Sequence, residues 1–305
     1  MRSEVEGDVS RVLVTGIHGF TGLHLSAALE QAGHEVYGTV RAGEPTGAMR
    51  LRADLTDPQA LRDAIDHVQP HHIVHLAAVS FVAHGDVQEI YRTNIVGTRN
   101  LLQALASSRV AKSLGTVLLA SSGNIYGHAD AAWIDETQAL CPSNDYAVSK
   151  VAMEQMAALW ADQLPITVVR PFNYTGQGQS RRFLIPKIVH AFAQRQPVLS
   201  LGNLDVYRDF TDVRDVVQAY VALLQASPRQ TLNVCSGHVH SLREILAMAQ
   251  AISGHVLEVQ VDPLFVRQNE VRMLRGSAKK LQQWLPQWQP RPLQETIAWM
   301  LSGSP

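Results

Sequence analysis

Short apolar runs alternate repeatedly with segments of helical spacing along the first part of this chain. The runs are rich in β-branched residues and cover 11–15, 35–40, 71–78, 115–122 and 166–172. The helical segments cover 19–34, 58–68, 93–108 and 146–163. Strands that are apolar along their whole length are typical of a parallel sheet buried on both faces. The pattern therefore predicts an α/β fold, a doubly wound parallel sheet with right-handed connections.

Composition narrows the kinds of partner that this chain can have. Its 305 residues are 46% hydrophobic and 17% charged, with a net charge of −1. A nearly neutral protein has no general field for nucleic acid or an anionic membrane, so we expect neither partner, and an anionic ligand must be held by a local cluster. Cys141 and Cys235 are the two cysteines, and the polar start does not resemble a secretory signal. We therefore expect no disulfide framework and a cytoplasmic protein.

The histidines do not have the spacing of metal ligands. His71 and His72 are adjacent, so they cannot share one face of a helix or strand. His238 and His240 can share a face of an extended segment, but no cysteine or carboxylate lies beside them. We therefore predict no metal site and interpret these residues as surface and loop histidines.

A glycine-rich stretch joins the first predicted strand to the first predicted helix. In "TGIHGFTG", Gly16, Gly19 and Gly22 are spaced by two residues, and Phe20 and Thr21 begin the helix. Glycines at this position permit a tight turn and a close approach of the backbone to a pyrophosphate at the helix N-terminus. A glycine triplet alone is weak evidence, but this placement predicts a dinucleotide-binding Rossmann fold.

The end of the second predicted strand bears on the choice of dinucleotide. NAD-selective folds usually place an acid there, against the adenosine ribose. This chain has Thr39 and Arg41 instead, and a guanidinium suits a 2′-phosphate, so we expect NADP(H), with NAD(H) as the alternative cofactor. A solvated Arg41 without a ligand is the competing interpretation. Further residues expected at the cofactor are Asp54 and Leu55 at the adenine, and Leu76, Ala77 and Ala78 beside the pyrophosphate.

The second half of the chain predicts an additional lobe. After Pro171 the sequence becomes rich in glycine, asparagine and glutamine, which indicates a loop, and the segment 238–305 is mixed and punctuated by proline. We expect a dinucleotide-binding domain over 11–171, with 206–236 rejoining its sheet. The predicted substrate-binding lobe consists of 172–205 and 237–305, and residues 1–10 form a loose tail.

Tyr146 and Lys150 lie four residues apart in "YAVSK", on one face of a predicted helix. A phenol has a pKa near 10 and is a poor acid or base at neutral pH, but a neighbouring cation stabilises the phenolate. Such a pair can also occur by chance as a surface pair. The pattern nevertheless indicates an acid–base pair once the other motifs are included.

The ordered set of motifs resembles the extended short-chain dehydrogenase/reductase family over nearly the whole chain. The set is the glycine stretch, "SSGNIYG", "YAVSK" and "RPFN". The resemblance implies that Tyr146 exchanges a proton with the substrate oxygen and that Lys150 tunes it and binds the nicotinamide ribose. It implies that Ser122 hydrogen-bonds the reacting oxygen and that Asn94 is a structural asparagine at the site. It also implies a homodimer built from helices that flank the sheet.

In its second half the chain resembles the GDP-4-keto-6-deoxy-D-mannose reductases, relatives of GDP-mannose 4,6-dehydratase. The segments that carry the resemblance are "RPFNYTGQGQS", "GNLDVYRDFTDVRDVVQAY", "NVCSG" and "NEVRMLRGS". It implies a GDP-sugar substrate, whose binding residues are Ser80, Asn124, Asn173, Arg208, Arg267 and Glu270. A salt bridge from Arg208 to Asp209 or Asp212 is the competing interpretation. Tyr174 and Thr175 depart from the subgroup pattern, so the sugar is left open.

The loop "SSGNIYG" distinguishes reduction from dehydration. Dehydratases of the resembled family carry an acid two positions before the loop tyrosine, where this chain has Asn124. Asparagine cannot accept a proton at neutral pH. The leading hypothesis is therefore NADPH-dependent reduction of the 4-keto group of a GDP-linked 6-deoxyhexulose, giving GDP-D-rhamnose or its talose epimer. A sugar-nucleotide 4-epimerase and a non-catalytic NADP-binding scaffold or sensor are the alternatives.

Overall fold

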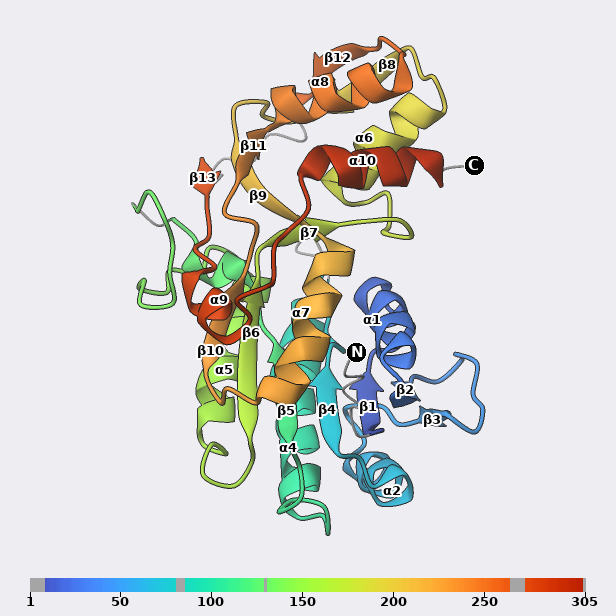
Figure 1. The fold of residues 1–305 in the computed structure, drawn as a ribbon, viewed down its shortest axis with the longest axis vertical. Helices are drawn as coiled ribbons and strands as arrows, with labels where there is room; N and C mark the ends of the chain where they lie inside the picture. The colour runs from blue at the N-terminus through green and yellow to red at the C-terminus, as the bar shows by residue number, and fades with distance from the viewer. Residues whose placement is uncertain (1–8, 81–85, 129–130, 264–271, 304–305) are drawn as a thin grey trace, which may run out of the picture. The chain divides into compact units, whose positions relative to one another are not determined.

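A computed structural model describes residues 9–80, 86–128, 131–263 and 272–303 of the chain (Figure 1). Most of the tail predicted at 1–10 lies outside these ranges, as do Arg267 and Glu270. Within the described ranges, none of the helices combines the length and the apolar character needed to cross a membrane.

Seven strands form the main sheet, in the order β10-β6-β5-β4-β1-β2-β3. Neighbouring strands from β6 to β3 pair in parallel. From β1 the chain adds strands first on one side and then on the other, so the order reverses between β1 and β4, where doubly wound sheets bind ligands. The predicted fold class is thus confirmed. The strands are β1 Arg11–Thr15, β2 Glu35–Val40, β3 Arg50–Arg52, β4 His72–His75, β5 Thr116–Ala120, β6 Ile166–Pro171 and β10 Thr231–Val234.

Contacts within the chain divide it into two compact units. The first unit comprises the described residues of Met1–Ser122, Asn144–Val169 and Val217–Thr231. The second comprises those of Gly123–Ser143, Arg170–Val216 and Leu232–Pro305. The domain limits expected from the sequence stay a prediction.

The first unit buries one face of its sheet under a layer of helices. Alternate strand residues, among them Leu13, Ile73 and Val117, are fully buried in one cluster with Leu61 of α2 and Leu101 of α4. α2 shows why its segment is helical: the Asp57 carboxylate caps its first turn, and a proline follows at the first helical position. The helices of this unit are α1 Phe20–Gln31, α2 Pro58–Val68, α3 Val87–Tyr91, α4 Thr98–Ala106 and α5 Asp145–Ala158, and α7 Val213–Ala226 enters it at Val217.

The segment 93–108, predicted as one helix, begins instead as a π-helix. The π-helix covers Arg92–Gly97 and leads directly into α4. A π-helical turn accommodates one more residue than an α-helical turn, and such turns are frequent at functional sites. Here the Asn94 carboxamide accepts from the backbone N–H of Val79 (2.9 Å) and donates to the Val79 carbonyl (3.1 Å). These contacts tie the π-helix to the loop after β4.

The second unit contains a small mixed sheet built around β9. β11 pairs antiparallel with β9, whereas β13 and β7 pair parallel with it. β7 occupies a segment that the sequence suggested was a loop, because its partner strand lies some distance away in the sequence. Helices α6, α8 and α10 share a buried apolar cluster. The elements are β7 Asn173–Thr175, α6 Leu184–Ala193, β8 Val198–Leu201, β9 Tyr207–Asp212, β11 Val239–Ser241, α8 Leu242–Ser253, β12 Glu258–Val261, β13 Met273–Leu274, α9 Lys279–Trp284 and α10 Leu293–Ser302.

Candidate active site

The glycine loop after β1 closes tightly on itself. Gly16 has a φ of +72°, and a Cβ added there would lie 2.9 Å from the backbone of Ala77. A Cβ on Gly22 would collide with the carbonyl oxygens of Gly16 and Ile17. Gly19 donates its backbone N–H to the Gly16 carbonyl at 3.0 Å. The loop therefore tolerates no side chain at Gly16 or Gly22, as a backbone cradle requires.

The start of α1 suits an anion. Gly19 is its N-cap residue, so no side chain caps the helix, and the first turn contains no acidic residue. The amide groups of a helix's first turn point along its axis and favour negative charge. Phe20 and Thr21 open this helix. The cradle and the uncapped helix end fit the pyrophosphate of a dinucleotide.

At the end of β2, Thr39 is buried, whereas the Arg41 side chain is 72% exposed. Glu44 lies beside this arginine, with its Oε1 atom 3.8 Å from the Arg41 Nε atom. After β3, Leu55 is buried and Asp54 accepts two hydrogen bonds from Thr56. Burial alone would raise the pKa of Asp54, but these hydrogen bonds and the charges of Arg41 and Arg92 lower it below its ordinary value. Asp54 is thus a stable carboxylate at this edge of the sheet.

A buried hydrogen-bonded chain supports the loop after β4. The Ala77 N–H donates to the Thr15 hydroxyl (3.2 Å), which lies 2.7 Å from His75 Nδ1. On the other side, His75 Nε2 lies 2.8 Å from the Thr98 hydroxyl, whose proton is donated to the Asn94 carbonyl (2.8 Å). Burial, aided by the charge of Lys150, lowers the pKa of His75 to about 3, so the ring is neutral.

The hydrogen bonds of this chain determine the His75 tautomer. The Thr98 hydroxyl uses its single proton on a carbonyl, so it must accept from His75 Nε2. A neutral ring has one N–H, so Nδ1 accepts from the Thr15 hydroxyl. The chain ties β1 and the π-helix to the loop that holds Leu76, Ala77 and Ala78. Ser80, at the end of the described part of this loop, is exposed.

Asn94 joins the same loop to α5. Besides its two contacts with Val79, its amide donates to the Ser149 hydroxyl at 2.9 Å. That hydroxyl donates to the carbonyl of Tyr146 at 2.7 Å. Asn94 is 1% exposed, and its carboxamide is hydrogen-bonded to Val79 and Ser149. The side chain acts here as a structural bridge between the loop after β4 and the turn that carries Tyr146.

Tyr146, Lys150 and Ser122 are all buried in the first unit. α5 begins at Asp145, with Asn144 as its side-chain cap, so Tyr146 lies in the first turn and Lys150 one turn later. The Lys150 ammonium lies 5.9 Å from the centroid of the Tyr146 ring. It donates to the carbonyl of Ala120 at 2.7 Å, two residues before Ser122. Lys150 therefore places its charge beside the Tyr146 ring while it is bonded to the end of β5.

The electrostatic state of Lys150 follows from its burial. Its side chain is 4% exposed, and burial lowers its pKa from 10.5 to about 8 against the opposing effect of Glu154. The ammonium remains protonated at neutral pH. A positive charge in a poorly solvated position interacts strongly with a nearby phenol or an incoming anion.

The segment after Ser122 turns into a short 3-10 helix, Gly123–Tyr126, anchored by its tyrosine. Tyr126 is fully buried and donates its hydroxyl proton to Asn233 (2.7 Å), while Arg170 donates to the hydroxyl (2.8 Å). Burial raises the pKa of Tyr126 to about 12, so this phenol does not titrate near neutrality. Asn124, within the same turn, is partly exposed and has no carboxylate chemistry.

The second unit holds the residues predicted to contact the substrate. The Asn173 Nδ2 atom is buried and has no hydrogen-bond partner among the described residues. Buried amides are normally paired, so this atom is suited to an acceptor on a ligand. Arg208 donates to the carbonyl of Tyr207 at 2.9 Å, and the carboxylate of Asp212 pairs with Arg214 at 2.7 Å. Arg267 and Glu270 fall outside the described residues.

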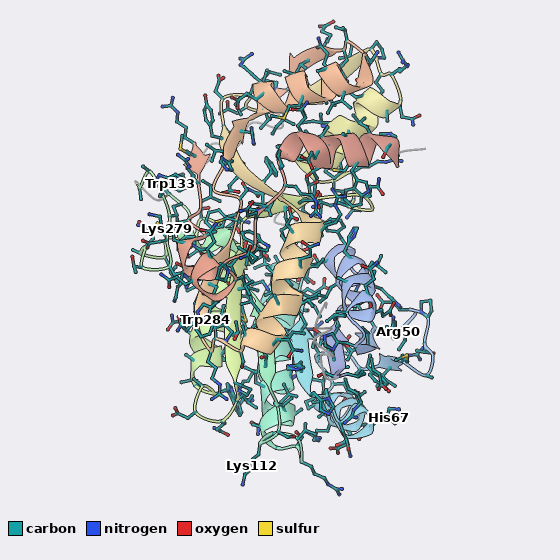
Figure 2. The ribbon with its side chains drawn as sticks, in the orientation of Figure 1. Arg50, His67, Lys112, Trp133, Lys279 and Trp284 are labelled. Atoms are coloured by element: carbon teal, nitrogen blue, oxygen red, sulfur yellow. The ribbon has the colours of Figure 1, made fainter. Side chains whose placement is uncertain are left out.

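An aromatic stack fixes another loop of the second unit. Trp133, labelled in Figure 2, lies under the guanidinium of Arg275, with 3.4 Å between the guanidinium carbon and the ring centroid. Arg275 also donates to the carbonyl of Gly237 at 3.0 Å. The stack holds the loop containing Trp133 against the segment that follows β13.

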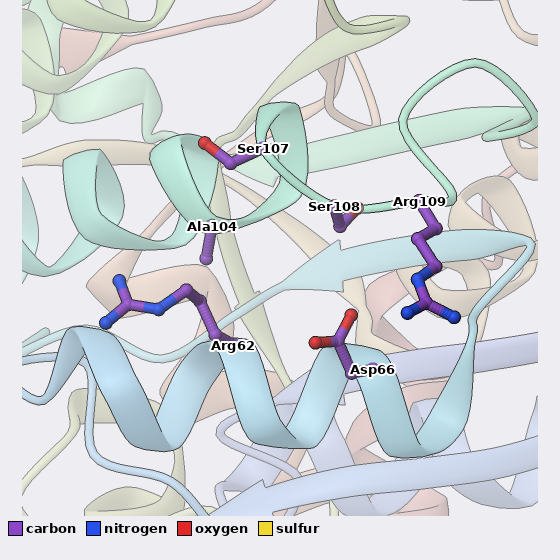
Figure 3. A pocket seen from close by; sticks show the side chains of 6 residues that line it. All are labelled: Arg62, Asp66, Ala104, Ser107, Ser108 and Arg109. Atoms are coloured by element: carbon purple, nitrogen blue, oxygen red, sulfur yellow. The ribbon is translucent and has the colours of Figure 1, made fainter.

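A hollow of about 150 Å³ between α2 and the end of α4 is not the candidate site (Figure 3). Its lining residues are Arg62, Asp66, Ala104, Ser107, Ser108 and Arg109, none of which belongs to the motifs described above. The side chains of Arg62, Asp66 and Arg109 line this hollow, so it contains charges of both signs. Among the described residues, no three His, Cys, Asp or Glu side chains are grouped to hold a metal ion.

Several features of the site were not predicted from the sequence. They are His75, Thr15 and Thr98 in the buried chain, Glu44 beside Arg41, and the Tyr126–Arg170 anchor. The only available signal for His75 was its position at the end of a buried run. The others depend on contacts between distant segments.

Comparison with known proteins identifies the family. The family model for GDP-mannose 4,6 dehydratase matches residues 13–300. A GDP-6-deoxy-D-talose 4-dehydrogenase from Aggregatibacter actinomycetemcomitans is 36% identical over 273 residues, covering 89% of this chain and 90% of the relative. A GDP-6-deoxy-D-mannose reductase from Pseudomonas aeruginosa is 36% identical over 292 residues, covering 91% and 92%.

Solved structures agree with this assignment. A protein from Burkholderia cenocepacia J2315, described provisionally as an epimerase, is 49% identical with a TM-score of 0.91, covering 96% of this chain and 97% of that one. RMD from Pseudomonas aeruginosa, complexed with NADPH, is 34% identical with a TM-score of 0.83, covering 96% and 97%. The resemblance noted from the motifs is confirmed. The chain belongs to the GDP-mannose 4,6-dehydratase family.

Proposed function

We propose that the chain is an NADPH-dependent reductase of the 4-keto group of a nucleotide-linked 6-deoxyhexulose. The substrate is GDP-4-keto-6-deoxy-D-mannose, and the product is GDP-D-rhamnose or its talose epimer. The observation that carries the proposal is the buried Tyr146–Lys150 pair with Ser122, in a chain that has Asn124 at the position of the dehydratase acid. The names of the two curated relatives, a 4-dehydrogenase and a reductase of GDP-6-deoxyhexoses, support it.

The chain's own residues supply the acid and the orientation for this reaction. NADPH, when bound, supplies the hydride for carbon 4. Ser122 donates a hydrogen bond to the ketone oxygen and orients the carbonyl. Tyr146 then gives its phenolic proton to the same oxygen, so hydride and proton together convert the ketone to an alcohol. Holding both reactants in one site provides much of the acceleration.

Lys150 has two functions in this proposal. Its buried ammonium stabilises the phenolate that Tyr146 leaves after giving up its proton. It also offers a donor to the nicotinamide ribose, through the ammonium that contacts the carbonyl of Ala120. The glycine cradle, Leu76, Ala77 and Ala78 hold the rest of the cofactor, and Arg41 takes the 2′-phosphate.

Asn124 argues against dehydration. Elimination of water from GDP-mannose needs a base near the reacting carbon, and an asparagine side chain cannot accept a proton at neutral pH. Ketone reduction needs no such base. The protein should therefore use up a 4-keto sugar and leave GDP-mannose unchanged.

The experiment offers both substrates to the purified protein. With NADPH and GDP-4-keto-6-deoxymannose, we expect oxidation of NADPH and one reduced sugar, whose configuration at carbon 4 is read by NMR. With GDP-mannose and NADP⁺, we expect no 4-keto product. Formation of that product would overturn the proposal in favour of a dehydratase.

The substrate-binding part of the proposal assigns roles to six polar and charged residues. Asn173 and Arg208 bind the substrate pyrophosphate, and Arg267 and Glu270 bind near the phosphate and ribose. Arginine suits a pyrophosphate because its donors make charge-assisted, often bidentate bonds. Ser80 and Asn124 contact the sugar. The Nδ2 atom of Asn173, which is buried without a partner among the described residues, supports its part in this set.

A 4-epimerase is the second candidate, because the Burkholderia structure is described provisionally as one. An epimerase regenerates its cofactor in each cycle, whereas a reductase consumes NADPH in proportion to product. Measuring both quantities in one reaction separates the two. One NADPH oxidised per sugar converted supports reduction, and conversion without net oxidation supports epimerisation.

We also propose a homodimer that acts in the cytoplasm. Val96 in the π-helix and Val148 on α5 are exposed apolar side chains on segments that contact each other in the first unit. Apolar residues on such a face are suited to a helical interface. Analytical ultracentrifugation of the purified protein, with Val148→Glu as the disrupting variant, tests the assembly. A monomeric parent protein contradicts it.

A further inference from the structure

Glu44 joins the glycine loop to the end of β2. Its Oε2 atom accepts the backbone N–H of Arg41 at 3.0 Å and lies 3.6 Å from Nδ1 of His18. Its Oε1 atom lies 3.8 Å from the Arg41 Nε atom. The Glu44 backbone N–H returns to the Arg41 carbonyl at 3.2 Å, closing a turn. The carboxylate is thus held between the two segments expected to enclose the adenosine ribose.

The position of this carboxylate relates it to the cofactor. His18 lies between Gly16 and Gly19 in the pyrophosphate cradle, and Arg41 follows the strand whose end faces the ribose in this fold. In NADPH the ribose carries a phosphate at its 2′ position, whereas in NADH it carries a hydroxyl. An acid near this position accepts a hydrogen bond from the hydroxyl and repels the phosphate.

Arg41 and Glu44 therefore act in opposite directions on the same group. The guanidinium is 72% exposed and can turn to a phosphate, whereas the carboxylate is 31% exposed and is held by a backbone amide. Other charges face the same edge: His18 lies beside Glu44, and Asp54 interacts with Arg41 and Arg92. Both side chains are in contact with solvent, which keeps each interaction modest, so the carboxylate can offset part of the attraction of the guanidinium for a phosphate.

We propose that Glu44 is a specificity-determining residue that offsets Arg41, so that the site binds NADH as well as NADPH, with a narrow preference for NADPH. The inference rests on the proposed function only in assuming that a nicotinamide dinucleotide binds the glycine cradle. An NAD-selective site would lack the guanidinium, and a strictly NADP-selective site would lack the carboxylate.

The test measures binding of each dinucleotide by calorimetry, without any sugar substrate. Glu44→Gln keeps the side-chain length and an oxygen acceptor for the Arg41 amide but removes the charge. We expect it to raise the ratio of NADPH to NADH affinity about three- to tenfold, with a smaller effect at high salt. Arg41→Gln should lower that ratio below the parent value. Glu35→Gln, at the exposed opposite end of β2, is the matched control and should leave the ratio unchanged.

Other binding results would overturn the inference, the proposed function, or both. An unchanged ratio in Glu44→Gln, in a variant with the parent's thermal melting temperature, overturns the inference while leaving the reductase proposal intact. Binding of the parent protein to one dinucleotide alone also overturns it. Binding of both dinucleotides without sugar reduction refutes the proposed function but leaves this inference standing. Binding of neither overturns both.

Discussion

Replacing Lys150 by Met should make the protein's stability respond differently to pH. The folded state holds the pKa of Lys150 at about 8, below its ordinary value of 10.5, because the ammonium is buried. Between these values the unfolded chain binds more protons than the folded protein does. The free energy of unfolding therefore rises with pH across that window, and below about pH 8 the full cost of burying the charge is present. This cost is about 3 kcal/mol.

The assay is urea unfolding of the parent protein and of Lys150→Met, without cofactor, at several pH values. The Met variant has no ammonium to bury, so its stability lacks this contribution. Between about pH 7 and about pH 9.5, the parent should gain about 2 kcal/mol relative to the variant, since most of the folded protein has then lost the Lys150 proton. Loss of the hydrogen bond to Ala120 shifts the variant by a constant amount and does not affect this difference.

Lys112→Met is the control, because Lys112 is exposed at the surface (Figure 2). It should follow the parent at every pH. A difference between the parent and Lys150→Met that stays constant from neutral to alkaline pH would refute the reasoning. So would a difference of opposite sign, since it would mean that the folded protein stabilises the charged ammonium more than water does.

Three further predictions follow from the site. Tyr146→Phe should retain cofactor affinity but lose about a hundred- to ten-thousand-fold in the rate of single-turnover NADPH oxidation. Ser122→Ala should lose less, because one neutral hydrogen bond is worth less than proton transfer. Near-normal turnover in Tyr146→Phe would exclude the mechanism. His75→Phe should weaken NADPH binding in a calorimetric titration, because it removes the hydrogen bonds to Thr15 and Thr98 that support the loop after β4. His75→Gln should recover part of the lost affinity. Equal affinity in both variants and the parent would contradict this role of His75. Tyr126→Phe should destabilise the protein by about 1–3 kcal/mol in urea unfolding, because Asn233 and Arg170 lose a buried partner, and an unchanged midpoint would contradict this.

The sheet could be predicted from the sequence because its signals are local. β1 and β5 are runs of buried residues, and α2 carries its cap and its apolar stripe within a few turns. β7 lacked such a signal. Its three residues form a strand because they pair with β9, and composition alone suggested a loop. The π-helix was missed for a similar reason, since Asn94 makes its side-chain contacts with Val79 and with α5.

The residues of the candidate site likewise fall into those that local sequence predicts and those that it does not. Tyr146 and Lys150 could be paired from the sequence because four residues of helix bring them to one face, and the glycine loop is contiguous. The arginine at the end of β2 could also be noted. The carboxylate that contacts it could not be assigned a role, because only the turn closed between Arg41 and Glu44 brings the two side chains together.

Departures from ordinary protein structure occur both within and outside the predicted site, so no single departure identifies a functional residue. Ser26 and His72 also have buried polar atoms without partners among the described residues, and neither belongs to a motif. A stronger indication comes where several such features occur together. Asn94 combines a π-helical turn with a fully buried carboxamide, and Lys150 combines a buried ammonium with a position beside the Tyr146 ring. Keeping such features costs stability, so their retention in neighbouring segments of the first unit is best explained by function.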